Sequence, residues 1–194
     1  GYKTVMSNGY YLDLVYGVED HYTVDPMPKN VALTQEEKAR ILGGEAAMWT
    51  ELATPETIDS RLWPRTAAIA ERLWSAETIT DINSLRKRLN TISFRLEELG
   101  LTHLKNKEVI LRNIANNQNT DALNEFSNVC EPLKKYSRNK GGTEYQMYSP
   151  FTLFADACTP DATNALAFNA VVNQYLENKN VENKAKVTDY LNKW

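Results

Sequence analysis

Apolar and polar positions in the first 51 residues change over short distances, as expected for strands separated by loops. Residues 3–7 predict a short strand, and residues 8–30 predict a long irregular loop that ends in two prolines. Residues 33–40 are charged and predict one or two helical turns. The stretch ILGGEAAMWTE, residues 41–51, predicts a strand whose small side chains let neighbours pack closely on both faces. Long loops that follow strands often carry functional sites.

From residue 54 onwards the spacing of apolar positions is helical. Residues 54–77 have helical spacing among Ala67, Ala70, Leu73 and Trp74, and Pro64 is tolerable in the first turn of a helix. The clearest helix runs from residue 80 to Gly100, with apolar residues at steps of three and four: Ile82, Leu85, Leu89, Ile92, Leu96 and Leu99. Further helices are predicted over residues 108–116, 121–130, 159–179 and 182–193. Thr159 and Pro160 have the chemistry of an N-cap and first helical residue for the third of these helices. Residues 134–150 are predicted to form a polar loop.

This order of elements predicts α/β structure followed by mainly α structure. We expect one domain over residues 1–103 and a helical region over residues 104–194. Strand, loop, strand and helix is the order of an α/β unit. Two strands are too few to protect the edges of a parallel sheet, so we expect the α/β part to be a piece of a larger sheet or barrel.

Composition and charge exclude several classes of protein. The 194 residues are 42% hydrophobic and 24% charged, with a net charge of −3, which gives no reason to expect nucleic acid or an anionic membrane as partner. No apolar run reaches the roughly 18 residues needed to span a bilayer, and the first residues do not read as a secretion signal. We therefore expect a piece cut from a longer protein.

Cysteine and histidine are scarce. Cys130 and Cys158 read more readily as two small core residues than as a disulfide, and the sequence leaves their pairing open. His21 and His103 lie far apart in the sequence, so the chain offers few histidines for a zinc site or for a Ser/His/Asp catalytic system.

Each predicted strand ends with an aromatic residue and a carboxylate on one face. Alternation along a strand puts Trp49 and Glu51 on the same side, and in the first strand's extension it puts Tyr11 with Asp13. In α/β barrels the carboxyl ends of the strands carry the active site. An indole next to a carboxylate suits a sugar, since the ring face stacks on the pyranose and the acid accepts hydrogen bonds from hydroxyls. The pattern points to a carbohydrate site.

Structural explanations of the same residues remain open at this point. A tryptophan at the end of a buried strand is more often a core residue, and Asp13 could cap a turn. Glu45 reads as a buried acid paired with Arg65 or Arg72, because an unpaired buried charge is costly.

Three motifs carry a family resemblance. YYLDL, ILGGEAAMWTE and SRLWPRTAAIAERLWS, in this order, resemble the C-terminal part of the catalytic barrel of glycoside hydrolase family 20, the β-N-acetylhexosaminidases. The likeness is strong over residues 5–75 and extends to residue 101. The tail resembles the helical extension that follows the barrel in some bacterial members. The resemblance implies the last strands and helices of a TIM (β/α)8 barrel followed by a helical C-terminal extension.

The resemblance also implies an activity and roles for four residues. The family removes terminal N-acetylglucosamine or N-acetylgalactosamine from glycans or chitooligosaccharides with retention, and the substrate's own acetamido oxygen attacks the anomeric carbon. By motif, Tyr11 would bind the acetamido oxygen, Asp13 and Glu51 the 4- and 6-hydroxyls, and Trp49 would form a wall of the pocket. No cofactor and no metal are implied.

One departure from the family pattern is large. The family's Asp-Glu pair, which orients the acetamido group and supplies the general acid, has no counterpart in this sequence, and neither has its sugar-binding arginine. We therefore expect the isolated chain to be inactive. Its open sheet edges predict packing against the remaining N-terminal barrel, self-association or rearrangement. The parent is expected to be periplasmic or secreted.

Two rival functions remain open on the sequence. The chain could be a non-catalytic helical module for carbohydrate binding or interaction, in which case it would be a stable monomer that binds a glycan without hydrolysing it. It could also come from another glycosidase whose barrel ends similarly, which Tyr11 argues against. The sequence does not decide between gluco and galacto substrates, nor the linkage or aglycone.

Overall fold

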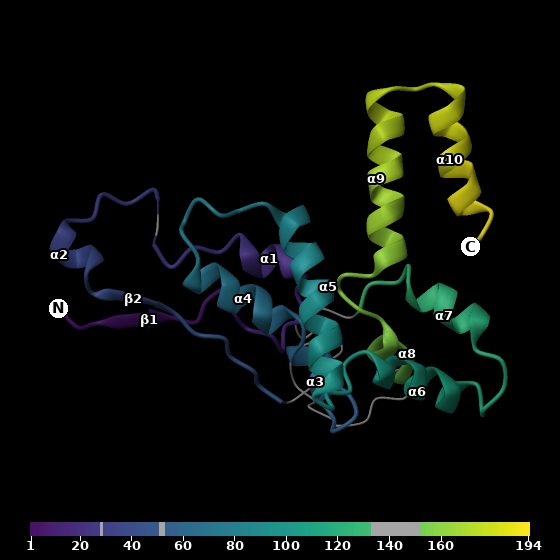
Figure 1. The fold of residues 1–194 in the computed structure, drawn as a ribbon, viewed down its shortest axis with the longest axis horizontal. Helices are drawn as coiled ribbons and strands as arrows, with labels where there is room; N and C mark the ends of the chain where they lie inside the picture. Colours follow the sequence, from purple (N-terminus) through teal and green to yellow (C-terminus); the bar gives the residue numbers. More distant parts are fainter. Residues whose placement is uncertain (28, 51–52, 133–151) are drawn as a thin grey trace, which may run out of the picture. The chain divides into compact units, whose positions relative to one another are not determined.

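A computed structural model describes residues 1–27, 29–50, 53–132 and 152–194. The described residues fall into two compact units. The first unit holds residues 1–106, and the second holds residues 107–132 and 152–194. The first contains a two-stranded sheet with helices, and the second contains helices (Figure 1).

The sheet of the first unit joins the two predicted strands in parallel. Strand β1 (Thr4–Met6) lies beside β2 (Ile41–Gly44), with Thr4 opposite Ile41 and Met6 opposite Gly44 (Figure 1). Regular pairing ends at Gly44, so the prediction of one continuous strand over residues 41–51 was wrong. The reason is a turn after β1, in which the N–H of Tyr10 donates to the carbonyl of Ser7 at 2.9 Å and interrupts the ladder.

A short helix, α1 (Val18–Tyr22), lies in the segment that the sequence predicted to be irregular. The Asp20 carboxylate accepts a hydrogen bond from the N–H of Gly17 at 3.0 Å, which satisfies a donor at the helix start. The helix buries Val18, His21 and Tyr22. The predicted helical turn over residues 33–40 is present as α2 (Gln35–Lys38).

The predicted helix over residues 54–77 is divided into α3 (Ile58–Leu62) and α4 (Arg65–Trp74). Pro64 is the N-cap of α4. The buried face of α4 differs from the predicted one, since Ala70 lies outside it and Trp74 is 92% exposed. The face that α4 buries consists of residues three and four positions apart: Arg65, Ala68, Ile69 and Arg72.

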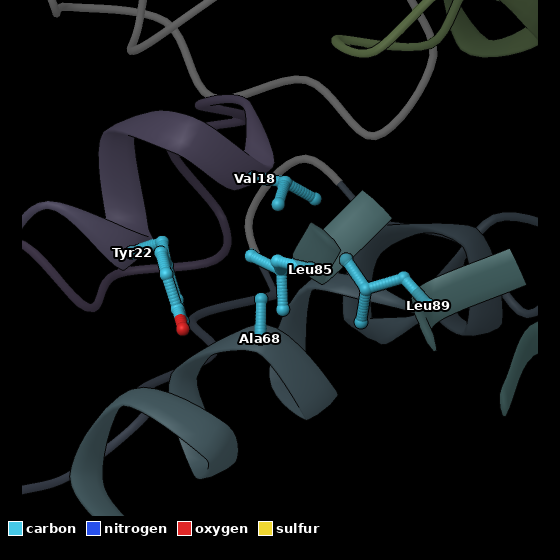
Figure 2. Close-up of a cluster of buried hydrophobic side chains, with 5 residues drawn as sticks. All are labelled: Val18, Tyr22, Ala68, Leu85 and Leu89. Atoms are coloured by element: carbon cyan, nitrogen blue, oxygen red, sulfur yellow. The ribbon is translucent and has the colours of Figure 1, made fainter. Parts of the chain in front are cut away.

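Helix α5 (Ile82–Glu98) confirms the clearest helix predicted from the sequence. The Asp81 carboxylate caps its first turn by accepting from the N–H groups of Asn83 and Ser84. Gly100, with φ +95°, follows its end. The main core of the unit lies where α1, α4 and α5 meet, and its buried side chains are shown in Figure 2: Val18, Tyr22, Ala68, Leu85 and Leu89.

The second unit consists of short helices and a helical hairpin. Its helices, together with α6 (Lys105–Ile114), which begins at the boundary, are α7 (Asp121–Ser127), α8 (Thr152–Ala157), α9 (Thr163–Glu177) and α10 (Val181–Leu191). Helices α9 and α10 lie side by side (Figure 1). The start predicted at Thr159 was wrong, because α9 begins at Thr163, after a turn. A small core joins α6 to α8 through Ile110, Leu111 and Ala157.

No disulfide joins Cys130 to Cys158, which answers the question that the sequence left open, and Sγ of Cys158 donates to the carbonyl of Phe154 at 3.4 Å. Among the helices of the described segments, none is both long and apolar enough to cross a lipid bilayer. The predicted polar loop over residues 134–150 lies outside the described residues.

Candidate functional site

The two segments that carry the predicted site residues are joined by backbone hydrogen bonds. The N–H of Leu12 donates to the carbonyl of Ala47 at 2.8 Å, and the N–H of Ala47 donates to the carbonyl of Tyr10 at 3.0 Å. Tyr11 thereby forms a parallel bridge with Ala47, beyond the end of the regular sheet. Trp49 follows two residues after Ala47. The two segments therefore meet beyond the carboxyl ends of two parallel strands, although they lie far apart in the sequence.

Asp13 lies in a tight turn that follows this bridge. The N–H of Val15 donates to the carbonyl of Leu12 at 3.1 Å, and Val15 adopts φ +57°. A β-branched residue in this region is strained by about 1–3 kcal/mol, so the turn persists only because its surroundings hold it. Leu12 and Val15 are both buried, and the Asp13 side chain is 5% exposed. The position of the Asp13 carboxylate is therefore set by packing around a strained turn.

A buried arginine holds the far side of the same turn. Arg65, the first residue of α4, is 2% exposed and donates through Nη1 to the carbonyl of Tyr16 at 2.9 Å. It also donates through Nη2 to the carbonyl of Arg61. Because backbone carbonyls accept these hydrogen bonds, the guanidinium group ties the segment after Asp13 to the start of α4.

Tyr10, the residue before Tyr11, is held in place by its buried side chain. Tyr10 is fully buried, and its hydroxyl donates to the carbonyl of Val24 at 3.1 Å. Burial raises the pKa of Tyr10. A Cβ added at Gly44 would lie 2.5 Å from Cε2 of the Tyr10 ring. Gly44 is therefore small because the aromatic ring of the neighbouring strand passes over its Cα.

Trp49 points away from the core of this chain. Its side chain is 57% exposed, whereas the preceding Met48 packs against the cluster of Tyr10, Leu12 and Ile69. The alternative in which Trp49 fills a core position does not hold within the described residues. An exposed indole offers a face on which a ligand ring could stack. Glu51, the fourth predicted site residue, lies outside the described residues.

The expected buried ion pair of Glu45 is wrong. Glu45 is exposed, and its Oε1 accepts a hydrogen bond from Ser7 Oγ at 2.5 Å. Arg72 instead forms a salt bridge with Asp25 at 2.9 Å, and Arg65 donates to carbonyl groups. Glu45 follows the last residue of β2 on the side that faces solvent, where a carboxylate needs no buried partner.

Two surface cavities lie elsewhere in the first unit. One, of about 570 Å³, is lined by residues from the end of α4 to α5, among them Glu71 and Arg88. Another, of about 200 Å³, is lined by residues that include Asp25 and Arg72. Neither cavity is lined by a predicted site residue. Within the described residues, no three His, Cys, Asp or Glu side chains are grouped so that they could hold a metal ion.

Three residues around the site were not predicted from the sequence to belong to it. The sequence indicated Arg65 only as a possible partner of Glu45 and His21 only as an isolated histidine, and Val15 carries no sequence signal for a strained conformation. The one signal available in the sequence was the stretch YYLDLVYG, in which the order of apolar and polar residues does not fit a regular strand.

Comparison with known proteins gives one consistent result. Residues 1–77 match the model of the glycosyl hydrolase family 20 catalytic domain. The mouse (Mus musculus) β-hexosaminidase subunit beta is 36% identical over 104 residues, which covers 52% of this chain and 19% of the relative. A chitooligosaccharidolytic β-N-acetylglucosaminidase of Ostrinia furnacalis is 38% identical over 116 residues, with the same two shares.

A solved structure extends the likeness to the whole chain. The X-ray structure of a Flavobacterium johnsoniae chitobiase superimposes with a TM-score of 0.94 at 75% sequence identity, covering 100% of this chain and 30% of that one. This chain thus spans about a fifth of the length of the curated relatives and under a third of the solved chitobiase. Residues 1–77, which include the site segments, thus match the catalytic domain of glycosyl hydrolase family 20, and the full length of the chain is similar in fold to a solved chitobiase.

Proposed function

We propose that this chain is the C-terminal part of a β-N-acetylhexosaminidase: the last strands and helices of a (β/α)8 barrel, followed by a helical extension. The longer protein, meaning this chain extended N-terminally by the rest of that barrel, removes terminal N-acetylglucosamine or N-acetylgalactosamine from glycans. The observation that carries the proposal is the Tyr11–Ala47 bridge, because it joins two of the family motifs at the carboxyl ends of parallel strands.

Exposed side chains of the sheet support the proposal that this chain is one part of a larger barrel. Strands β1 and β2 leave Val5 47% exposed and Leu42 60% exposed, which is unusual for strands of this apolar composition. Parallel sheets are normally covered on both faces and continued at their edges. In the complete barrel, further strands would pair with the edges of β1 and β2, and the barrel interior and its outer helices would cover these side chains.

The proposed reaction uses the substrate as its own nucleophile. The acetamido oxygen attacks the anomeric carbon, the bond from that carbon to the leaving-group oxygen breaks, and a general acid protonates the leaving oxygen. Water then gives a proton to the same group, now acting as general base, and attacks the same carbon. The bond from that carbon to the acetamido oxygen breaks, so the configuration is retained. The Tyr11 hydroxyl donates a hydrogen bond to the acetamido oxygen and holds it in line with the anomeric carbon.

The remaining site residues bind the terminal sugar. The indole of Trp49 stacks on the apolar face of the pyranose, which its exposure in this chain allows. The Asp13 carboxylate accepts from a hydroxyl at the 4-position, and its packed turn gives it a fixed direction. Glu51 has the corresponding role at the 6-hydroxyl, on the support of the sequence motif alone.

The isolated chain lacks the Asp-Glu pair that the family uses, so leaving-group protonation has no agent in it. Loss of general acid catalysis costs typically ~10²–10⁴ in rate. We therefore propose that catalysis requires the longer protein.

Hydrolysis of a chromogenic N-acetyl-β-glucosaminide by the longer protein and by this chain alone tests the proposal. The longer protein should release the chromophore and this chain should not. A longer protein that binds N-acetylglucosamine without turnover would support a carbohydrate-binding module instead, and turnover by this chain alone would contradict the assignment of the general acid to the missing part.

A further inference from the structure

We propose that His21 is a positioning residue for Tyr11: its buried imidazole holds the turn Ser7–Tyr10 and thereby sets where the Tyr11 hydroxyl lies. This inference rests on the proposed function of Tyr11.

The turn needs such a support because strand pairing alone does not fix it. Between the Met6–Gly44 pair and the Tyr11–Ala47 bridge, one strand uses five steps and the other three. The two additional residues are looped out. Gly9 adopts φ +87° within the loop, a conformation that suits glycine. The direction in which Tyr11 leaves the turn therefore depends on what packs against it.

His21 contacts this loop at Gly9, the residue with the positive φ. Its Nδ1 lies 2.8 Å from the carbonyl oxygen of Gly9, twelve residues earlier in the chain. A carbonyl oxygen only accepts, so Nδ1 carries the proton and donates. The imidazole is 0% exposed. A Cβ added at Gly9 would lie 2.7 Å from Cγ2 of Val24, so His21 of α1 and a residue that follows this helix both pack against the loop.

The second ring nitrogen of His21 indicates that the imidazole does more than fill space in the core. Nε2 of His21 is buried and has no hydrogen-bond partner among the described residues. A buried polar atom without a partner is costly, whereas an apolar ring of similar shape would avoid that cost. The hydrogen bond to Gly9 is the interaction that offsets this cost, and it acts on the loop that carries Tyr11.

The surroundings keep the imidazole neutral. Burial lowers the pKa of His21, the positive charge of Arg65 on α4 lowers it further, and Asp20 on its own helix and the bond to Gly9 oppose this. The Tyr16 ring meets the imidazole edge to face, with ring centroids 6.4 Å apart. A neutral donor at Nδ1 holds the carbonyl without adding a second charge beside Arg65.

The test compares two variants of His21 in the longer protein. His21→Phe keeps the ring and removes the donor, whereas His21→Asn places an amide N–H near the position of Nδ1. Since misplacement of a positioning group by about 1 Å costs up to ~10²-fold, kcat for an N-acetyl-β-glucosaminide should fall by roughly 10- to 100-fold in His21→Phe. His21→Asn should recover most of it.

His103→Phe is the matched control. His103 is also buried in this unit, and its Nε2 is hydrogen-bonded to Ser93 Oγ at 2.6 Å, away from the loop. This variant should lower the melting temperature and leave kcat unchanged. In a Tyr11→Phe background, His21→Phe should cost little further activity, because the group that it positions is already gone.

Hydrogen exchange separates the inference from the proposed function. The amides of Tyr10, Leu12 and Val15 are hydrogen-bonded in the structure, and their exchange should quicken in His21→Phe and not in His103→Phe. An unsubstituted longer protein without activity would contradict the proposed function alone. Unchanged exchange in His21→Phe, or a loss of kcat that simply adds to that of Tyr11→Phe, would overturn the positioning role.

Discussion

Tyr11 and Ala47 form a parallel bridge beyond the end of the regular sheet, and the hydrogen bonds on either side of it measure 2.8 and 3.0 Å. This bridge joins two segments that each carry an aromatic residue and a carboxylate. It also explains how a site can form where the strands themselves have ended: a looped-out turn on one side lets the ladder resume three residues after Gly44. The geometry of the proposed site therefore depends on this junction.

Replacement of Trp49 should weaken substrate binding with little effect on stability. The side chain is 57% exposed in this chain, so Trp49→Ala removes few internal contacts and removes the proposed stacking surface. We expect KM for an N-acetyl-β-glucosaminide to rise by about tenfold, which corresponds to roughly 1.4 kcal/mol, near the upper end for aromatic stacking. Steady-state kinetics of the longer protein measure this. Trp74→Ala, at a 92% exposed position of α4, is the control and should leave KM unchanged.

Asp13→Asn should lower kcat/KM by about 10- to 100-fold, since a hydrogen bond to a charged group contributes roughly 1.5–3 kcal/mol. The shape of the side chain is kept, so the packed turn around Leu12 and Val15 should survive. A substrate without its 4-hydroxyl provides the decisive comparison. The variant and the unsubstituted protein should hydrolyse that substrate at similar rates, and an undiminished gap between them would contradict the assigned contact.

The core at the meeting point of α1, α4 and α5 predicts a stability effect. Leu85 is 0% exposed and packs against Val18, Tyr22, Ala68 and Leu89 (Figure 2). Leu85→Ala should lower the free energy of unfolding by about 2–5 kcal/mol. Leu99→Ala, at an 81% exposed position just after the same helix, should change it by less than about 0.5 kcal/mol. Urea denaturation of both variants measures the difference, and equal effects would mean that this cluster is not the core.

The two buried histidines predict a dependence of stability on pH. Burial lowers the pKa of His21 and of His103. Below the ordinary histidine pKa of about 6.5, the unfolded chain therefore binds more protons than the folded one. The free energy of unfolding should fall as the pH drops from about 6.5 to the lowered values, and the histidine contribution should level off below them.

The His21→Phe, His103→Phe double variant checks this assignment. Its free energy of unfolding should vary less between about pH 7.5 and about pH 5 than that of the unsubstituted protein, because the two groups with lowered pKa are gone. An equally steep dependence in the double variant would assign the effect to other groups.

Local signals decided which helices the sequence could predict. Helix α5 has a capping aspartate, Asp81, a long apolar repeat and Gly100 after its end, so its bounds follow from the sequence alone. Helix α1 has only five residues, and its burial depends on α4 and α5, which no local pattern reveals. The start of α9 was misplaced because Thr159 and Pro160 have the chemistry of a cap but lie before a turn that precedes the helix.

The buried face of α4 was missed for a different reason. Hydrophobic periodicity counts arginine as exposed, yet Arg65 and Arg72 are buried because carbonyl groups of distant segments accept their hydrogen bonds. Only the tertiary fold supplies these acceptors. The same periodicity therefore favoured Ala70 and Trp74, which lie outside the buried face.

The candidate site was partly predictable from the sequence. The alternation of aromatic and acidic residues is enough to indicate Tyr11, Asp13 and Trp49 as candidates. The way in which their segments meet was not predictable, because the Tyr11–Ala47 register follows from a looped-out turn, and Val15 gives no sign of its positive φ. The contacts of residues that support this loop, such as His21, depend on the tertiary fold and are not visible in the sequence.

Substrate selectivity tests the central claim most directly. The ratio of kcat/KM for an N-acetyl-β-glucosaminide to that for the matching β-glucoside, which lacks the acetamido group, should be measured for the longer protein and its Tyr11→Phe variant. The account predicts a large ratio that falls at least about tenfold in Tyr11→Phe, because the lost hydroxyl acts only on the acetamido oxygen. Equal rates on the two glycosides, or a ratio that Tyr11→Phe leaves unchanged, would contradict it.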